Sequence, residues 1–365
     1  MNDGTRVVRA GLPEPEQGRP FLPGPALAAP YHLRGDPEGT EYVYGRYGNP
    51  TWSAYERALS ELEGGEAVLF ASGMAAVTAV LLSSLRPGAA LALPSDCYMH
   101  VRGLAGGHLA ELGVEVTQIA TPELVPDALP ERLDLLWLET PSNPGLELCD
   151  VRALAGAAQE RGALVVVDNT FATPLGQQPL ALGADLSVTS ATKHLSGHGD
   201  LLLGYVAARN PERAERLRSW RSETGAIAGP FEVWLAHRSL ATLELRLERG
   251  EANALALAQL LEGRRGVAGL RYPGLPGDPA HELAKRQMRR FGTLLCFDLG
   301  SRERAEAFLG AARLVTEATS FGGVPTTAER RARWGGDDVP EGFIRLSAGC
   351  EATDDLLADV EQALA

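Results

Sequence analysis

The sequence is poor in cysteine and in clustered positive charge. Its 365 residues include four cysteines, widely separated and without a CxxC pair, which is typical of reduced thiols in a cytosolic setting. The formal net charge is −13 and no basic run appears, which argues against a nucleic-acid-binding surface. The first residues, Met1 to Gly4, lack the basic and apolar regions of a secretory signal peptide. We therefore expect a cytoplasmic protein that does not bind nucleic acid.

A membrane-spanning segment is missing as well. The longest candidate, residues 67–85, has 19 residues without a charge, close to the length of a bilayer-spanning helix. Ser72 and Gly73 divide this stretch, and hydroxyl side chains lie in its second half. A buried strand, a tight turn and a buried helix explain this pattern better than a membrane helix does. We expect a soluble protein without a membrane partner.

Nucleotide- and metal-binding motifs are also lacking. The chain has no GxxxxGK phosphate loop and no GxGxxG fingerprint, which counts against a nucleotide-dependent oxidoreductase. His194 and His198 lie four residues apart, as two metal ligands on one helix face would. However, Gly197 and Gly199 disfavour a helix there, and no HExxH pattern occurs. We expect no metal.

What the chain does have is a regular alternation of short apolar runs with helical segments. Runs separated by helices indicate a mainly parallel sheet that is buried on both faces, in the α/β class. We expect strands at 68–70, 91–93, 114–119, 133–138, 164–167, 186–189 and 201–207, and helices at 74–85, 102–112 and 150–161.

The two ends of the chain differ from this central pattern. Eight of the 24 prolines fall in the first fifty residues, so we expect residues 1–50 to form an extended arm that contacts a neighbouring subunit. Leucines at helical spacing predict one long helix over 237–261. Strands at 294–297 and 343–346, with helices at 302–311 and at the C-terminus, then predict a smaller α/β domain. The expected domains are 1–50, 51–236 and 237–365.

An aspartate and a lysine stand at the ends of two predicted strands. Asp168 ends the most apolar strand, and Lys193 follows it by 25 residues, flanked by the hydroxyls of Ser190 and Thr192. Taken alone, the lysine would be a solvated charge and the aspartate a cap on the turn through Asn169. Together they are what a protein needs to hold pyridoxal phosphate (PLP). The lysine bonds to the aldehyde as a Schiff base, and the acid keeps the pyridine nitrogen protonated.

Two further segments suit the same cofactor. Gly73 and Met74 follow Ser72 between a strand and a helix, where free backbone amides can bind a phosphate. Tyr98 follows another strand end, where its ring can stack on a cofactor and its hydroxyl can transfer protons. Each of these signals is weak alone, because many α/β turns have a similar sequence and an isolated tyrosine is usually a packing residue.

Seven segments, in order along the chain, resemble the Cys/Met-metabolism family of PLP-dependent enzymes, of the cystathionine γ-lyase and γ-synthase type. The resemblance is closest to cystathionine γ-lyase. It implies the fold-type I (aspartate aminotransferase-like) architecture, with the PLP-binding domain at 51–236. The segments are Tyr44–Thr51 (YGRYGNPT), Ala71–Ala76 (ASGMAA), Glu139–Pro144 (ETPSNP), Val167–Thr170 (VDNT), Ser190–Lys193 (SATK) with Gly197–Asp200 (GHGD), Ser320–Gly323 (SFGG) and Ile344–Ser347 (IRLS).

The resemblance implies roles for individual residues. Lys193 and Tyr98 would be catalytic, while Arg345, Ser320 and Asn143 would bind the substrate, with Arg345 on its α-carboxylate. The residues implied to bind the cofactor are Tyr44, Arg46, Gly73, Met74, Tyr98, Asn143, Asp168, Ser190, Thr192 and Lys193. Of these, Tyr44 and Arg46 would reach the phosphate in a neighbouring subunit, within a homotetramer built from dimers with shared active sites.

The activity implied is γ-elimination on cystathionine, a small amino-acid substrate, giving cysteine, 2-oxobutyrate and ammonia. Methionine γ-lyase, a γ-synthase using an O-acylhomoserine and a γ-lyase for an unusual amino acid are the alternatives. A PLP-fold protein kept only for binding is disfavoured by the intact lysine, aspartate and arginine. The chain departs from the family pattern at Met99, at His100 and at Thr319, where cystathionine-preferring lyases often carry an acid. From their positions, Arg102 and His100 are candidates for contacting the distal end of the substrate.

Overall fold

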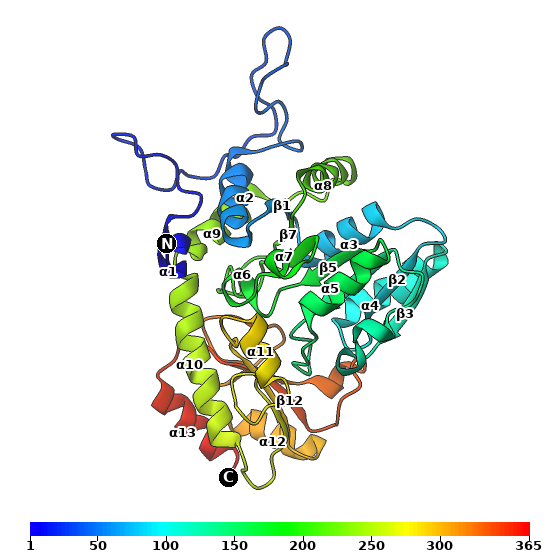
Figure 1. The fold of residues 1–365 in the computed structure, drawn as a ribbon. Helices are drawn as coiled ribbons and strands as arrows, with labels where there is room; N and C mark the ends of the chain where they lie inside the picture. The colour runs from blue at the N-terminus through cyan, green and yellow to red at the C-terminus, as the bar shows by residue number, and fades with distance from the viewer.

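The computed structural model describes residues 1–365 and contains two β-sheets (Figure 1). The larger sheet has seven strands in the order β1-β7-β6-β5-β4-β2-β3. Strand β7 runs antiparallel to β1 and β6, and the other pairs are parallel, so the predicted mainly parallel sheet is confirmed. The strands are β1 (Glu66–Phe70), β2 (Ala90–Pro94), β3 (Glu115–Ile119), β4 (Leu135–Glu139), β5 (Leu164–Asp168), β6 (Leu186–Thr189) and β7 (Gly204–Ala208).

Thirteen α-helices connect and cover the strands. A five-residue π-helix, Ala105–Leu109, continues α4, and three short 3₁₀ turns precede β4 or follow β11. The α-helices are α1 (Asp3–Arg9), α2 (Pro50–Glu63), α3 (Gly73–Ser84), α4 (Met99–Leu104), α5 (Val151–Glu160), α6 (Thr173–Gly176), α7 (Pro179–Leu182), α8 (Pro211–Thr224), α9 (Pro230–Leu240), α10 (Leu243–Leu261), α11 (His281–Gln287), α12 (Arg302–Ala311) and α13 (Thr353–Ala363).

Both faces of the seven-stranded sheet are buried along its central strands, whereas the edge strand β3 is mostly exposed. In β5, Leu164 and Val166 pack into one core with α3 and α8. The alternate residues Val165 and Val167 pack into a second core with α5 on the other face. Successive side chains of a strand point to opposite faces, so an uninterrupted apolar run is what a strand covered on both sides requires.

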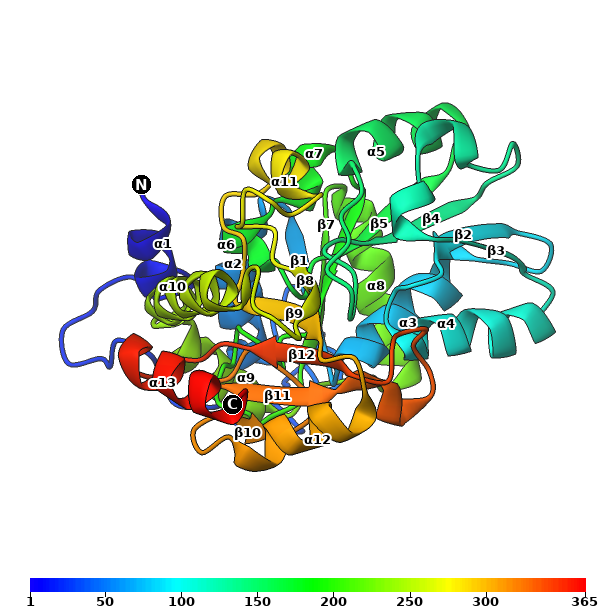
Figure 2. The same ribbon diagram turned by 90° about the horizontal axis from the view of Figure 1, so that it is seen from below.

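The smaller sheet has five strands in the order β10-β11-β12-β9-β8. One face packs against α10, α12 and α13 in a core of its own, and Figure 2 shows α12 and α13 alongside β11 and β12. The predicted second α/β unit is therefore present. Its strands are β8 (Ala268–Arg271), β9 (Leu294–Asp298), β10 (Thr316–Glu317), β11 (Thr327–Arg330) and β12 (Phe343–Ser347).

The prediction of one long helix over 237–261 is wrong, because the chain breaks at Ala241 and Thr242 between α9 and α10. Thr242 has φ −108° and ψ 5°, and its hydroxyl donates to the Ser239 carbonyl at 3.1 Å. A threonine hydroxyl bonded to nearby backbone competes with continued helix. The leucine spacing does not reveal the break because both helices bury leucines.

The N-terminal arm is extended only in part. Residues 3–9 form α1, which is capped by Asn2, whose side chain accepts from the Gly4 amide at 3.1 Å. Val7 and Ala10 pack into the core around α2, which explains why the short helix persists. Residues 12–49 contain no helix or named strand and loop away from the body of the molecule (Figure 1). None of the helices is long and apolar enough to cross a membrane.

The core of the larger sheet offers a test of this packing. Leu136 in β4 is fully buried, so Leu136→Ala should lower the free energy of unfolding by about 2–5 kcal/mol through lost apolar contact and a residual cavity. Leu245 in α10 is 63% exposed, and Leu245→Ala should change it by less than about 0.5 kcal/mol. Denaturant titration of both variants measures the difference. Equal effects would contradict the arrangement.

Candidate active site

A cavity of about 250 Å³ lies where the carboxyl ends of β4, β5 and β6 meet. Ligands of open α/β sheets characteristically bind outside the carboxyl ends of the strands. Ten of the twelve residues predicted to form the site line this cavity. They are Gly73, Met74, Tyr98, Asn143, Asp168, Ser190, Thr192, Lys193, Ser320 and Arg345.

Helix α3 begins at this cavity with the amides of Gly73 and Met74. Ser72 caps the helix by accepting from the Ala75 amide at 3.1 Å. The first amides of a helix have no acceptor within it, so they and the positive end of the helix can bind an anion. A Cβ on Gly73 would lie 2.8 Å from the Cβ of Ser190, so glycine is needed for Ser190 to approach the helix.

The two hydroxyls predicted to bind phosphate differ in their freedom to do so. The Thr192 hydroxyl donates to the Leu203 carbonyl at 3.2 Å and accepts from the Leu203 amide at 3.0 Å. To donate to a phosphate, it must give up the bond to that carbonyl. The Ser190 hydroxyl forms no hydrogen bond within the protein, whereas the Ser190 amide donates to Thr170. Ser190 is therefore the readier phosphate donor.

Asp168 lies at the end of β5 without a cation beside it. One carboxylate oxygen accepts from the Thr170 amide at 3.0 Å, and no Lys, Arg or His forms an ion pair with it. Burial raises the pKa of Asp168, while the hydrogen bonds from Thr170 oppose the rise. A buried carboxylate at a cavity wall is stabilised by a charged donor in that cavity. The protonated ring nitrogen of PLP is such a donor.

Glu139 is a functional candidate that the sequence analysis missed. It pairs with Asp168 across β4 and β5, and its Oε2 accepts from the Tyr98 amide at 2.7 Å. Burial is the larger cause and the negative charge of Asp168 the second; together they raise the pKa of Glu139 well above its usual range. Of the two carboxyl groups, Glu139 is the one whose neutral form its surroundings favour more strongly. Like Asp168 it ends a buried strand, and that signal could have identified it.

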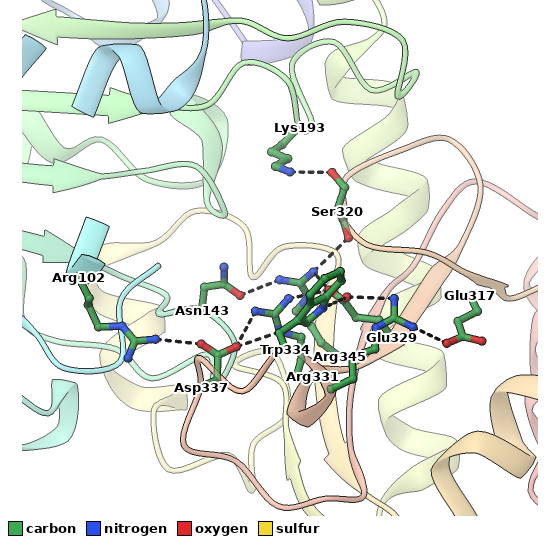
Figure 3. Close-up of polar contacts among 11 residues, drawn as sticks. Arg102, Asn143, Lys193, Glu317, Ser320, Glu329, Arg331, Trp334, Asp337 and Arg345 are labelled. Atoms are coloured by element: carbon green, nitrogen blue, oxygen red, sulfur yellow. Dashed lines mark hydrogen bonds and ion pairs between the residues drawn. The ribbon is translucent and has the colours of Figure 1, made fainter. Parts of the chain in front are cut away.

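Lys193 lies in the turn after β6, with its amine in the cavity (Figure 3). Its Nζ donates to the Ser320 hydroxyl at 2.7 Å and lies 4.9 Å from the centre of the Phe321 ring. Burial, followed by the positive charge of Arg345, lowers the pKa of Lys193 to about 8, while Glu329 opposes the shift. A lysine becomes a useful nucleophile and base when its pKa falls toward the working pH.

Arg345 comes from β12 of the smaller sheet and meets residues of both sheets. Its Nη1 donates to Asn143 Oδ1 at 2.7 Å, and its Nη2 donates to the Ser320 carbonyl at 3.2 Å and to Glu329. Ser320 has a φ of +80°, a strained value for a residue with a side chain. The strain places its hydroxyl against Lys193 and its carbonyl against Arg345. A fixed guanidinium beside a reactive amine can orient the carboxylate of an amino acid.

Arg331 also lines the cavity, and its Nη1 donates to the carboxylate of Glu329 at 2.8 Å. Neither residue was singled out from the sequence. Their place depends on the pairing of β11 with β12, which no local pattern indicates. The hypothesis that Arg102 contacts the substrate is not supported. Arg102 donates instead to the Gly336 carbonyl at 2.7 Å and forms an ion pair with Asp337.

Other residues singled out from the sequence lie as follows. His100 packs edge-on against Tyr98, with ring centroids 5.2 Å apart, and does not line the cavity. Thr319 does line it. Tyr44 and Arg46 lie on the arm outside it, and Arg46 donates to the Ser222 carbonyl at 2.7 Å. Their expected contact with a neighbouring subunit stays a prediction.

The residues around the cavity fit PLP at three points. Free amides of α3 with Ser190 suit the phosphate, unpaired Asp168 suits the ring nitrogen, and Lys193 suits the aldehyde. Tyr98 also lines the cavity, where its ring could cover the ring of the cofactor. The chemistry of the donor set therefore agrees with the cofactor expected from the sequence.

Comparisons with known proteins agree with this chemistry. Residues 5–365 match the family described as Cys/Met metabolism PLP-dependent enzyme. A Streptomyces coelicolor protein provisionally named cystathionine gamma-lyase is 57% identical over 99% of this chain and 93% of its own length. Cystathionine gamma-lyase of Bacillus subtilis is 41% identical over 89% of each chain.

Solved structures agree as well. The cystathionine gamma synthase of Xanthomonas oryzae pv. oryzae, solved in complex with cystathionine, superposes with a TM-score of 0.95 at 36% identity, covering 100% of this chain and 98% of that one. Names among the other similar proteins include cystathionine beta-lyase and methionine gamma lyase. The chain belongs to the Cys/Met metabolism PLP-dependent enzyme family, and its cofactor is pyridoxal 5′-phosphate.

Proposed function

We propose that this protein is a carbon–sulfur lyase that performs γ-elimination on cystathionine, releasing cysteine, 2-oxobutyrate and ammonia. One geometric observation carries the proposal: Ser320 bonds to the amine of Lys193 through its hydroxyl and to the guanidinium of Arg345 through its carbonyl. A base and a carboxylate-binding group are thus set side by side, as reaction at Cα of an amino acid requires. The similarity to cystathionine gamma-lyases supports the choice of reaction.

In this proposal, Arg345 binds the α-carboxylate through a bidentate pair, and Asn143 and Ser320 hold its guanidinium in place. Binding the carboxylate at one end of the cavity directs the Cα–H bond toward Lys193. Bound PLP supplies an electron sink for the charge that develops on the substrate. The protein supplies the orientation and the proton transfers.

Lys193 takes the proton from Cα and then moves the proton from Cβ, which allows the thiolate to leave from Cγ. Its lowered pKa places both the neutral and the charged amine within reach near neutral pH. The departing sulfur needs a proton, which Tyr98 or Lys193 provides. Burial raises the pKa of Tyr98, although Arg331 opposes the rise, so its hydroxyl is protonated and able to donate.

Methionine is the second candidate substrate, and Thr319 is the observation that favours it. Thr319 lines the cavity at the position where cystathionine-preferring relatives often carry an acid, which would suit the distal ammonium of cystathionine. The thioether of methionine has no distal charge and needs no such partner. A γ-synthase reaction on an O-acylhomoserine uses the same residues and is the third possibility.

The proposal extends to the assembly and setting of the enzyme. Phe21 and Leu27 on the arm are 90% and 77% exposed, which supports an arm of residues 1–50 that packs on a neighbouring subunit. There Tyr44 and Arg46 would reach the phosphate of the neighbour's cofactor, in a homotetramer. Residues 51–236 would form the PLP-binding domain and 237–365 the C-terminal domain. The four free cysteines support a cytoplasmic location.

Product analysis tests the reaction. With cystathionine, the cofactor-loaded protein should release 2-oxobutyrate and cysteine in equal amounts, because the bond that breaks is Cγ–S. Chromatography of the products, with methionine and O-succinylhomoserine run in parallel, measures the preference. Pyruvate with homocysteine would reveal β-elimination instead. Faster turnover of methionine than of cystathionine would favour the second candidate.

The pKa of Lys193 predicts how cofactor uptake depends on pH. Only the neutral amine can attack the aldehyde. The rate at which the apoprotein bonds to PLP, measured by trapping the bond with borohydride reduction, should therefore rise with pH and level off above about pH 8. Nα-acetyl-lysine, with an unshifted amine, should show a rate that keeps rising toward pH 10. Lys193→Ala should form no such attachment. A protein profile that follows the free amine would contradict the lowered pKa.

A further inference from the structure

Five charged side chains form a continuous chain of contacts from the cavity to helix α4, here called the Glu329 network (Figure 3). It begins at Arg345 in β12 and ends at Arg102 in α4, and so it links the smaller sheet to the segment that carries Tyr98. Its members are Arg345, Glu329, Arg331, Asp337 and Arg102.

Glu329 is the centre of the network. It lies in β11 directly across from Arg345 in β12, and its side chain is 1% exposed. Its carboxylate accepts from Arg345 Nη2, from Arg331 Nη1 at 2.8 Å and from Trp334 Nε1 at 2.9 Å. Three donors from three residues fix this carboxylate, and one of them is the guanidinium proposed to bind substrate.

The charges at this centre are maintained at neutral pH. Burial alone would raise the pKa of Glu329, but Arg345 and other donors hold it below its usual range. Burial lowers the pKa of Arg345 to about 10, which still leaves the guanidinium charged. Glu329 and Arg345 therefore form an ion pair beside the cavity, and the pairing restricts how the guanidinium can turn.

The outer half of the network reaches the segment that leads into α4. Asp337 accepts from Arg331 Nη2 at 2.5 Å and from Arg102 Nη2 at 3.0 Å. Arg102 Nε donates in turn to the Cys97 carbonyl at 2.8 Å, next to Tyr98. The network therefore connects the guanidinium of Arg345 to the start of α4.

A gain in folding stability does not explain well why five charged side chains are placed together here. Buried ion pairs often contribute little or nothing to stability compared with apolar residues of similar size, because taking charges out of water is costly. What charged partners do provide is a fixed orientation for a planar guanidinium. Here that orientation matters at Arg345, the member that the proposed function assigns to the substrate carboxylate.

We propose that Glu329 is a positioning residue: it holds the guanidinium of Arg345 in the orientation that receives the substrate α-carboxylate, and Asp337 supports it by holding Arg331 against Glu329. The inference rests on the role of Arg345 in the proposed function. It predicts that loss of the Glu329 charge weakens the binding of amino acids but not the binding of amines that lack the carboxylate.

The test compares two ligands of the PLP-loaded protein, L-norleucine and n-pentylamine, which is norleucine without its carboxylate. Dissociation constants come from the change in visible absorbance. Glu329→Gln should weaken norleucine binding about tenfold, on the order of one charge-assisted hydrogen bond, and leave pentylamine binding unchanged. Glu282→Gln is the matched control, because Glu282 pairs with Lys285 at 3.0 Å but is 73% exposed and has no contact with the network. It should change neither constant.

Two further variants separate the possible outcomes. Arg345→Lys should also reduce the preference for norleucine; if it does not, the role of Arg345 in the proposed function is wrong. If Arg345→Lys reduces the preference and Glu329→Gln does not, the inference about Glu329 is overturned. Should Glu329→Gln fail to fold or to retain cofactor, Asp337→Asn decides: a reduced preference for norleucine supports the inference, and an unchanged one overturns it. Equal weakening of both ligands by Glu329→Gln would indicate a purely structural role.

Discussion

The structure depends on one electrostatic constraint: two carboxyl groups end neighbouring strands side by side, with Glu139 buried and Asp168 at the cavity wall. Two like charges placed side by side away from bulk water cannot both ionise cheaply, so the pair favours one neutral member and a cation beside the other. No basic side chain pairs with Asp168. The protein thus contains a carboxylate that a cofactor with a protonated ring nitrogen stabilises, and the surrounding amides, hydroxyl and lysine suit the remaining groups of that cofactor.

The smaller sheet contributes a positive charge, Arg345, to the site that holds the two carboxyl groups. Arg345 comes from the smaller sheet, and its charge helps to lower the pKa of Lys193, which lies at the end of the larger sheet. In the proposed function, the two sheets contribute different parts of one reaction site: the larger sheet would hold the cofactor, and the smaller sheet would orient the substrate. Ser320, with its strained backbone, joins the two through its hydroxyl and carbonyl groups.

Features that depend on local sequence could be predicted, and those that depend on distant pairing could not. The strand that ends in Asp168 could be predicted from its apolar run, and the turn that carries Lys193 from the glycines that follow it. The break at Thr242 was hidden, because leucines continue at helical spacing on both sides of it. The place of Glu329 and Arg331 at the site could not be predicted, since only the register of β11 against β12 brings them to Arg345. Residues 3–9 form a helix because they pack on α2, a tertiary effect.

The central claim is that Asp168 holds the protonated ring nitrogen of PLP while Lys193 bonds to its aldehyde carbon. A crystal structure of the cofactor-loaded protein tests it most directly. The account predicts an Asp168 carboxylate oxygen within about 3 Å of the ring nitrogen and continuous density from Lys193 Nζ to the cofactor. A ring nitrogen that faces solvent or another residue, or a cofactor not attached to Lys193, would contradict it.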